Sequence, residues 1–186
     1  MLKILRKSTI YIPLLALMIA VAIGVNAADA PSAHAYGTNW WHSLSQQQRN
    51  QRIVDYANRD VGKWGGQCKA WVQGRVVFDA SGGHVWLPLN QPPPNDWMWY
   101  NDANGHAVGM SMPIENVQVG MIIQMKLKSG SPHTAIIAGK SSTGVTFIDS
   151  NWSTNNDEIV RVHSMTFSQF YGMLQSPGSY SVYYIL

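Results

Sequence analysis

The apolar residues in the first half of the chain recur at helical spacing. Ser45 and Gln48 have the spacing of a capping box, a pair of side chains that satisfies backbone groups at the start of a helix. The apolar stripe that follows ends before Gly62 and comprises Ile53, Val54, Ala57 and Val61. The pattern therefore predicts a helix over residues 45–61.

A second apolar pattern of helical period begins at or just before Cys68 and ends near the glycine pair at residues 82–83. Its apolar members are Ala70, Trp71, Val72, Val76 and Val77. We expect a second helix here that carries Cys68 just inside its first turn. Gly65 and Gly66 are then expected just outside the start of this helix.

The segment from residue 82 to residue 119 has no clear period and contains three consecutive prolines. A stretch of this length in a compact domain usually forms part of a functional site or contains short elements. After it, short apolar or alternating runs separated by turn residues indicate β-strands. The predicted strands cover residues 121–125, 134–138, 145–148, 159–162 and 181–185, with a short helix over 166–173 before the last strand.

Two helices followed by a series of short strands are typical of the α+β class. Because strands joined by short turns pair in opposite directions, we expect an antiparallel sheet. The predicted architecture is one domain over residues 45–186, in which the N-terminal helices pack on a sheet of about five or six strands. Residues 28–44 carry no periodic pattern and are expected to form an N-terminal arm or linker.

Residues 1–27 have the pattern of a secretory signal peptide. A short basic segment precedes an apolar run over residues 10–25, and small residues follow. Cleavage after Ala27 is the first expectation, and a second site of the same type lies at residues 33–35. The alternative is an uncleaved anchor, because the apolar run is close to the length of a membrane span. We therefore expect a secreted or cell-wall-associated protein, which contacts the membrane only if this segment stays uncleaved.

Charge gives little further information about partners. The chain has 13 lysine and arginine residues and 10 acidic residues. Cleavage after Ala27 removes Lys3, Arg6 and Lys7 and no acid, which leaves a formally neutral domain. The remaining basic residues form no cluster, so nucleic acid is not an expected partner. We expect a monomer.

Cys68 is the only cysteine in the chain. Small exported domains usually carry paired cysteines, and one cysteine cannot form an internal bridge. Cys68 is therefore an inert buried thiol, part of an intermolecular disulfide, or a reactive thiol. The start of a helix is compatible with a reactive thiol, because its dipole and unpaired N–H groups stabilise a thiolate and an oxyanion, but it leaves the inert thiol equally open. The glycines before Cys68 are expected to leave room for a substrate to approach the sulfur.

A reactive cysteine needs a partner histidine, and the chain has six histidines. His133 opens an apolar strand, where an imidazole ring is unusual, so it is the candidate. The alternative is a strand-edge histidine bonded to a neighbouring loop. The others are expected to be surface or turn residues: His34, His42, His84, His106 and His163. A metal site is not expected, because the chain has no close histidine or cysteine pair and no HExxH motif.

One strand later, Asp149 and Asn151 stand two residues apart. If the strand continues through both, their side chains point to the same face of the sheet. An acid or amide on that face could accept the imidazole N–H of His133 and hold the ring towards the thiolate. The alternative is that residues 149–151 form a simple turn.

Three motifs in order, GGQCKAW, SPHTAIIAG and VTFIDSNW, begin at Gly65, Ser131 and Val145. This set resembles the CHAP family of cell-wall amidases and peptidases, which are relatives of the papain-like NlpC/P60 group. The resemblance covers roughly residues 45–186, and its specificity lies in the ordered set. It implies a papain-like CHAP fold.

The resemblance also implies roles for individual residues. Cys68 matches the nucleophile and His133 the general base, while Asp149 and Asn151 fall on the acidic and amide positions of the family motif. Gln67 matches a glutamine that often precedes the cysteine, which implies an oxyanion site formed with the N–H of Cys68. Many members carry glutamate where this chain has Asp149, so either Asp149 or Asn151 is left to orient His133.

The eight tryptophans suggest where a substrate lies. Trp71, on the apolar face of the second helix, is expected in the core, and Trp152 is expected to pack behind the site. Trp64 and one of Trp97 or Trp99 are expected near the substrate, because aromatic rings in loops can stack on sugar or peptide groups. The segment that carries Trp97 and Trp99 departs from the family pattern, which leaves substrate preference open.

The residues and the resemblance together predict a secreted cysteine hydrolase that cleaves amide bonds in bacterial peptidoglycan through a thioester. It would act as an N-acetylmuramoyl-L-alanine amidase or as an endopeptidase, with peptidoglycan as its partner and no metal or other cofactor. One alternative is a non-catalytic cell-wall or glycan-binding protein on the same fold, in which Cys68 is merely buried. Another is a cysteine acyltransferase that uses the same triad.

Overall fold

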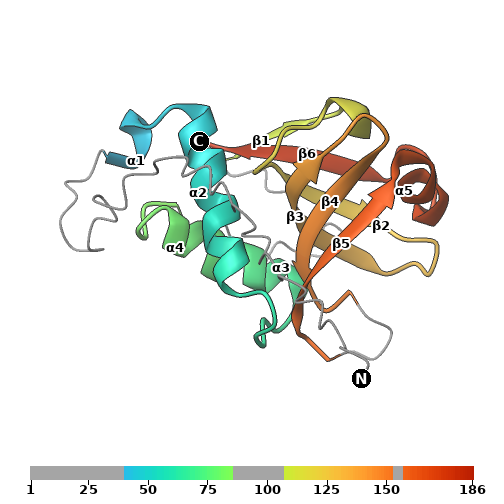
Figure 1. Cartoon of the computed structure of the whole chain (residues 1–186), viewed down its shortest axis with the longest axis horizontal. Helices are drawn as coiled ribbons and strands as arrows, with labels where there is room; N and C mark the ends of the chain where they lie inside the picture. Colours follow the sequence, from blue (N-terminus) through green and yellow to red (C-terminus); the bar gives the residue numbers. More distant parts are fainter. Residues whose placement is uncertain (1–39, 86–106, 153–156) are drawn as a thin grey trace, which may run out of the picture. The chain divides into compact units, whose positions relative to one another are not determined.

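A computed structural model describes residues 40–85, 107–152 and 157–186, which all belong to one compact unit. The expected signal segment, most of the expected arm, and Trp97 and Trp99 lie outside the described residues. Within the described ranges, no helix is both long and apolar enough to cross a membrane. The secondary structure is α+β, with most helices ahead of one antiparallel sheet (Figure 1).

The first predicted helix is present as α2 (Gln46–Arg59). The Ser45 hydroxyl accepts a hydrogen bond from the N–H of Gln48 at 3.2 Å, and the Gln48 side chain accepts one from the N–H of Ser45 at 2.8 Å. These two bonds form the predicted capping box and satisfy N–H groups that the helix itself cannot pair.

The second predicted helix runs without a break through three segments, α3 (Cys68–Ala70), η1 (Trp71–Val77) and α4 (Phe78–Ala80). It begins at Cys68 and ends just before the glycine pair at residues 82–83, as predicted. The central segment η1 is a π-helix, whose hydrogen bonds span five residues, and the apolar period did not predict it.

A short helix, α1 (Trp40–Ser43), lies in the segment that was expected to be a linker. Its Trp41 is fully buried, and the indole N–H donates to the backbone oxygen of Leu186 at 2.6 Å. The packed domain therefore includes α1.

The sheet has the strand order β1-β6-β2-β3-β4-β5, and every neighbouring pair is antiparallel. The strands are β1 (Ala107–Met110), β2 (Ile122–Lys126), β3 (Pro132–Lys140), β4 (Gly144–Ser150), β5 (Val160–Thr166) and β6 (Tyr180–Ile185). The last five agree with the predicted strands to within a few residues. The predicted short helix is present as α5 (Phe167–Met173).

The sequence did not predict β1 or the short 3-10 helix η2 (Ile114–Asn116). Both lie in the segment that shows no clear period. β1 is an edge strand with one half-buried residue followed by three exposed ones, so it carries no alternation of apolar and polar residues.

Both faces of the sheet are buried. Residues on one face pack against α1, α2 and η1, and they include Ile122, Ile136, Ile148, Val160 and Tyr183. Residues on the other face pack with Phe170 of α5 and Ile114 of η2, and they include Ile123, Met125, Ala135, Ile137 and Phe147. This two-sided burial explains why β2 and β3 read as nearly continuous apolar runs.

The start of β3, the end of β4 and the start of β5 lie at the same end of the sheet, because these strands are antiparallel neighbours. The loop before α3 is attached there by a β-bridge between Trp64 and Ile159. The helix start that carries Cys68 therefore lies beside this end of the sheet.

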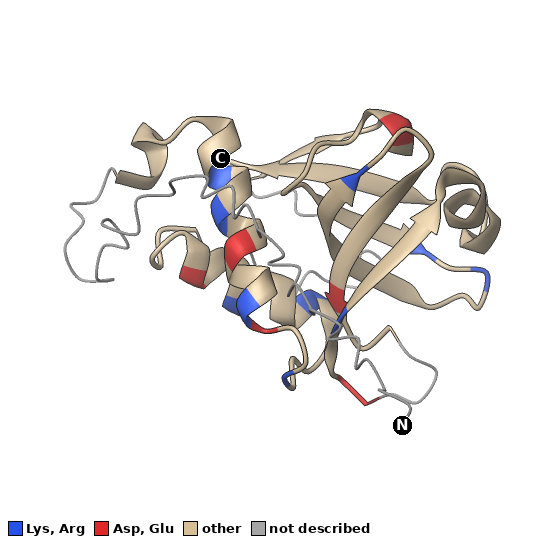
Figure 2. Ribbon diagram, in the orientation of Figure 1, with Lys and Arg blue, Asp and Glu red and all other residues tan. Residues whose placement is uncertain are grey.

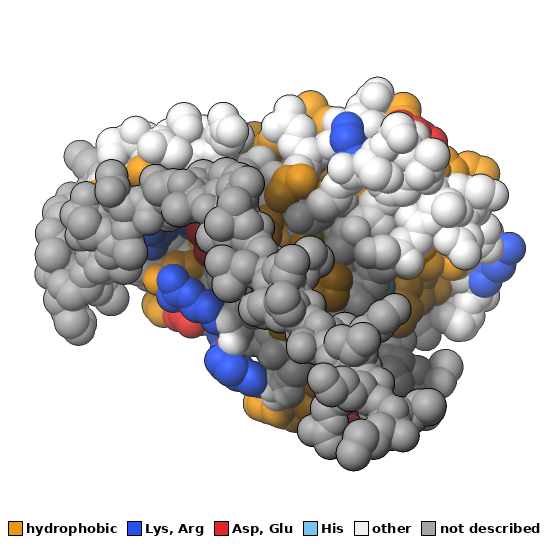
Figure 3. Space-filling view, in the orientation of Figure 1, with side chains coloured by type: hydrophobic (Ala, Val, Ile, Leu, Met, Phe, Trp, Pro, Cys, Tyr) orange, Lys and Arg blue, Asp and Glu red, His pale blue; other side chains and the backbone are white. Residues whose placement is uncertain are grey.

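Charged residues of both signs lie along α2, whereas the strands carry few (Figure 2). The charged residues of α2 are Arg49, Arg52, Asp55 and Arg59. On the face shown in Figure 3, basic, acidic and hydrophobic side chains of the described residues are interspersed. The described part of this face thus presents no extended surface of a single charge.

Candidate active site

The loop before Cys68 is packed tightly against the sheet. A Cβ on Gly65 would lie 2.6 Å from the Ser150 hydroxyl and 2.6 Å from a methyl of Val160. Gly66 has a φ of +76°, a conformation that glycine adopts without strain. The expectation that the glycines leave room for a substrate is therefore wrong at Gly65, where the missing side chain lets β4 and β5 approach the loop.

Glu158 holds the same loop from the other side. Its backbone oxygen accepts hydrogen bonds from the N–H groups of Gly65 at 2.7 Å and Gly66 at 3.2 Å. Its carboxylate accepts from the Trp64 indole at 3.0 Å and from the Gln67 amide at 2.7 Å. Glu158 has a φ of 54°, which is uncommon outside glycine and is maintained here by these bonds. No local pattern in the sequence indicates this role, because the loop and Glu158 are about ninety residues apart.

Cys68 is the first residue of α3 and is partly buried. Burial raises the pKa of its thiol, but a hydrogen bond to the His133 side chain and the positive charge of that ring lower it. The backbone N–H groups of Thr134 and Lys69 lower it further, and the resulting pKa lies below the ordinary value of a cysteine. The site therefore favours a thiolate.

His133 is the second residue of β3 and is 4% exposed. Burial lowers the pKa of its imidazole, but the carboxylate of Asp149 and the thiolate of Cys68 outweigh burial and raise the pKa to about 9. Nε2 of His133 faces Asp149, which leaves Nδ1 for the hydrogen bond to Cys68. Both shifts favour the form of the pair in which a Cys68 thiolate lies beside a His133 imidazolium.

Asp149 lies near the end of β4 and is completely buried. Its Oδ2 is 3.7 Å from Nε2 of His133, which is the distance of an ion pair and longer than a hydrogen bond. Its Oδ1 is 3.4 Å from Nε2 of His163, on β5. The carboxylate therefore lies between two imidazole rings.

His163 was expected to be a surface or turn residue, and the structure instead places it against Asp149 with 22% of its side chain exposed. The pairing of β4 with β5 sets it opposite Phe147 and on the face of the sheet that carries Asp149. The sequence alone does not show which residues of β4 and β5 stand opposite one another, which explains why it did not point to His163.

Asn151 does not share the face of Asp149. β4 ends at Ser150, and Asn151 has a φ of 62°, so the extended geometry on which that expectation rested is absent. The Asn151 amide donates to Oε1 of Gln67 at 3.1 Å. Of the two residues left open to orient His133, Asp149 faces the histidine and Asn151 faces Gln67.

The tryptophans divide as follows. Trp71 is 1% exposed and lies in the core, as predicted. Trp152 lies with its ring edge-on to His133 at 4.6 Å between centroids, and it stacks on His163 at 5.0 Å. Trp64 is 63% exposed at the loop before Cys68.

Among the described residues, no group of three or more histidine, cysteine or acidic side chains could hold a metal ion.

The solved structures that are similar to this chain include two of a protein named Ly7917. The first is described as the crystal structure of Ly7917 with the hydrolyzing product of MDP, and it aligns with a TM-score of 0.52 and 17% identity over 73% of this chain and 62% of that chain. The second, described as the crystal structure of Ly7917, aligns with a TM-score of 0.50 and 16% identity over the same shares. No protein-family model matches the chain, and no curated protein matches it in sequence. At this identity the likeness is one of fold, and this chain spans about 62% of the length of its structural neighbour.

Proposed function

We propose that this protein is a secreted cysteine hydrolase that cleaves amide bonds in bacterial peptidoglycan, on a papain-like fold of the CHAP type. The observation that carries the proposal is the pairing of a helix-start thiol with a buried imidazole, which in turn faces a buried carboxylate. A thiol with a lowered pKa beside an imidazole with a raised pKa is a nucleophile and a general acid in their reactive forms.

In the first half of the reaction, Cys68 Sγ attacks the carbonyl carbon of the scissile amide. The negative charge that develops on the carbonyl oxygen is stabilised by the N–H of Cys68, which begins the helix and has no helical acceptor. The Gln67 amide has two hydrogens and gives one to Glu158, so the other can donate to the oxyanion. His133 then protonates the leaving amine as the C–N bond breaks, which leaves a thioester on Cys68.

In the second half, neutral His133 removes a proton from a water molecule that attacks the thioester. The tetrahedral intermediate collapses, the C–S bond breaks, and a carboxylic acid leaves. Asp149 keeps the ring of His133 oriented and stabilises its charged form in both halves. No metal or organic cofactor takes part.

The similarity to Ly7917 supports peptidoglycan as the substrate. One of its structures is described with a hydrolysis product of MDP, which we take to be muramyl dipeptide, a fragment of peptidoglycan. The exposed Trp64 ring lies in the loop directly before the nucleophile and offers a stacking surface for such a sugar-peptide. The secretory pattern of residues 1–27 would place the enzyme on the same side of the membrane as this substrate.

The proposal is tested with the purified protein and its Cys68→Ala variant, each incubated with peptidoglycan of several chemotypes. Mass spectrometry should find new amine and carboxylate ends with the wild-type protein and none with the variant. Equal release by both proteins, or no release from any wall, would refute the hydrolase. Binding without release would indicate a glycan-binding protein, and ends that carry an added acyl acceptor would indicate an acyltransferase.

A further inference from the structure

The carboxylate of Asp149 lacks the donors that a buried charge requires. Both of its oxygens are buried, and neither accepts a hydrogen bond of good geometry from the described residues. A buried carboxylate without donors is strongly unfavourable, so such groups are normally paired. Two imidazoles approach it, His133 at Oδ2 and His163 at Oδ1, and the second is the closer.

Arg161 does not supply the missing donor. Arg161 stands directly opposite Asp149 in the ladder between β4 and β5. Its guanidinium instead forms two hydrogen bonds to Asp157, at 2.7 and 2.5 Å. Nε2 of His163 is itself buried and has no hydrogen-bond partner among the described residues, so it faces Oδ1 of Asp149 as the available donor.

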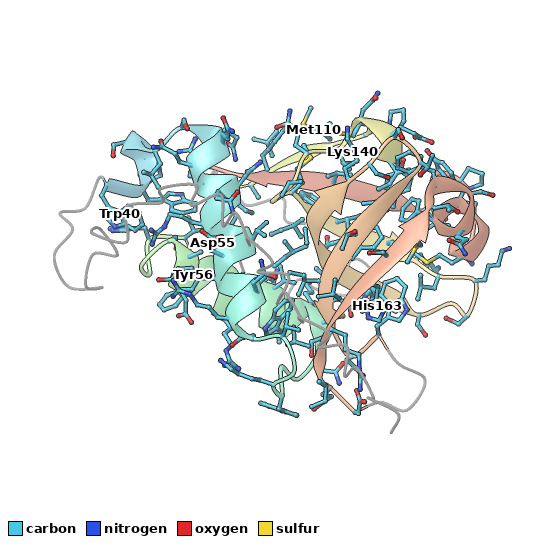
Figure 4. All side chains as sticks on the ribbon, in the orientation of Figure 1. Trp40, Asp55, Tyr56, Met110, Lys140 and His163 are labelled. Carbon is cyan, nitrogen blue, oxygen red and sulfur yellow. The ribbon has the colours of Figure 1, made fainter. Side chains whose placement is uncertain are left out.

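Trp152 fixes the arrangement of the two rings. Its indole stacks on His163 with an interplanar angle of 28° and meets His133 edge-on at 89°. Figure 4 labels His163 on β5, in the sheet and away from Asp55 and Tyr56 of α2. The tryptophan therefore limits the movement of both imidazoles while each points a nitrogen at the same carboxylate.

We propose that His163 is a second positioning residue of the site. Its Nε2–H donates to Oδ1 of Asp149 and fixes the rotation of the carboxylate, so that Oδ2 is directed at His133. His163 acts through Asp149 and does not touch the substrate. The inference that His163 supports catalysis rests on the proposed function, but the geometry does not depend on which substrate is cleaved.

Two variants separate the donor from the ring. His163→Phe keeps a ring to stack on Trp152 but has no donor, whereas His163→Gln keeps an N–H donor but has no ring. The full purified protein is alkylated with iodoacetamide across pH 5–10, and the rate reports the thiolate of Cys68 and the charge on His133. Asp55→Asn is the matched control, because this exposed carboxylate on α2 accepts its hydrogen bond from Gln51 and lies away from His163.

We expect His163→Phe to slow alkylation at neutral pH by about tenfold. The step in the profile that reports loss of the His133 proton should move to lower pH. His163→Gln should stay within about threefold of the wild-type rate, and Asp55→Asn should leave the profile unchanged. A wild-type profile for His163→Phe, or a larger loss for His163→Gln than for His163→Phe, would overturn the proposal. Because alkylation does not involve peptidoglycan, this result stands apart from whether any wall is cleaved.

A measurement on the wild-type protein covers the case in which His163→Phe does not fold. Long-range ¹H–¹⁵N NMR spectra show which imidazole nitrogens carry protons. We expect a proton on Nε2 of His163 at neutral pH. A neutral ring protonated only on Nδ1 would exclude the donor role.

Discussion

The two sides of the candidate site are held by different forces. On the sheet side, His133 and Asp149 are almost fully buried and interact through charge, with no hydrogen bond shorter than 3.5 Å between them. On the loop side, Gln67 is exposed and is held by neutral and charged hydrogen bonds to Asn151 and Glu158. Charges in a desolvated setting interact strongly and are costly to leave unpaired, whereas exposed hydrogen bonds are individually weak.

This difference predicts a division of labour. The sheet side sets the protonation states of the reacting groups, and the loop side sets the position of the oxyanion donors. Substitutions on the sheet side should therefore alter the reactivity of Cys68 towards any electrophile. Substitutions on the loop side should alter turnover of an amide while leaving simple alkylation intact, because alkylation forms no oxyanion.

The largest effect is expected for Asp149→Asn. The neutral amide no longer stabilises the imidazolium and can present the wrong group to Nε2, so kcat for peptidoglycan cleavage should fall about 100-fold or more. Alkylation of Cys68 at neutral pH should slow as well, and its alkaline limb should move to lower pH. Asp55→Asn on α2 serves as the control and should stay within about twofold of wild type. An intact alkylation profile in folded Asp149→Asn would show that the buried carboxylate does not control the pair.

The pH dependence is the next largest effect. The active form requires the Cys68 thiolate and the His133 imidazolium together. Because the pKa of His133 is raised to about 9, its proton is lost above that value, and kcat/KM should fall about tenfold from pH 7 to pH 10. Because the pKa of Cys68 is lowered, the acid limb should lie below the ordinary titration of a cysteine. A stopped assay across pH 4–10 measures both limbs, and an alkaline limb near pH 6.5 would contradict the raised pKa of His133.

The same contrast explains what the sequence could predict. The helix cap at Ser45, the start of the second helix at Cys68 and five of the strands follow local patterns, so periodicity and capping identify them. The edge strand β1 has no such pattern and was missed. The two helices and the sheet were thus predictable, while their exact boundaries depended on tertiary packing.

The site was predictable in its parts more than in its contacts. The ordered motifs identified Cys68, His133 and Asp149 as candidates, and the structure brings the three together. The position of His163 depends on which residues of β4 and β5 face one another. The contact of Gln67 with Glu158 depends on the positive φ of Glu158. Register and loop conformation of this kind leave no periodic signal in one sequence.

On the loop side, Gln67→Ala tests the proposed oxyanion donor. Loss of one side-chain donor should lower kcat for peptidoglycan about tenfold or somewhat more, with little change in KM, because the bond forms fully only in the transition state. The alkylation rate and its pH profile should match the wild type, since Gln67 makes no contact that sets the pKa of Cys68. Slowed alkylation in this variant would show that Gln67 helps to set the reactivity of Cys68, as the sheet-side residues do.

The smallest effect is expected for Asn151→Ala, and it distinguishes the two sides most directly. The Asn151 amide donates to Oε1 of Gln67, so Asn151→Ala removes one of the two hydrogen bonds of the Gln67 side chain. The other bond, to the Glu158 carboxylate, remains. We expect kcat to fall only about threefold, because one exposed hydrogen bond is worth about 1 kcal/mol or less. The alkylation profile should not move. If Asn151→Ala instead shifts the alkaline limb as Asp149→Asn does, then Asn151 orients His133 in solution, and the assignment of the carboxylate alone to that role would be wrong.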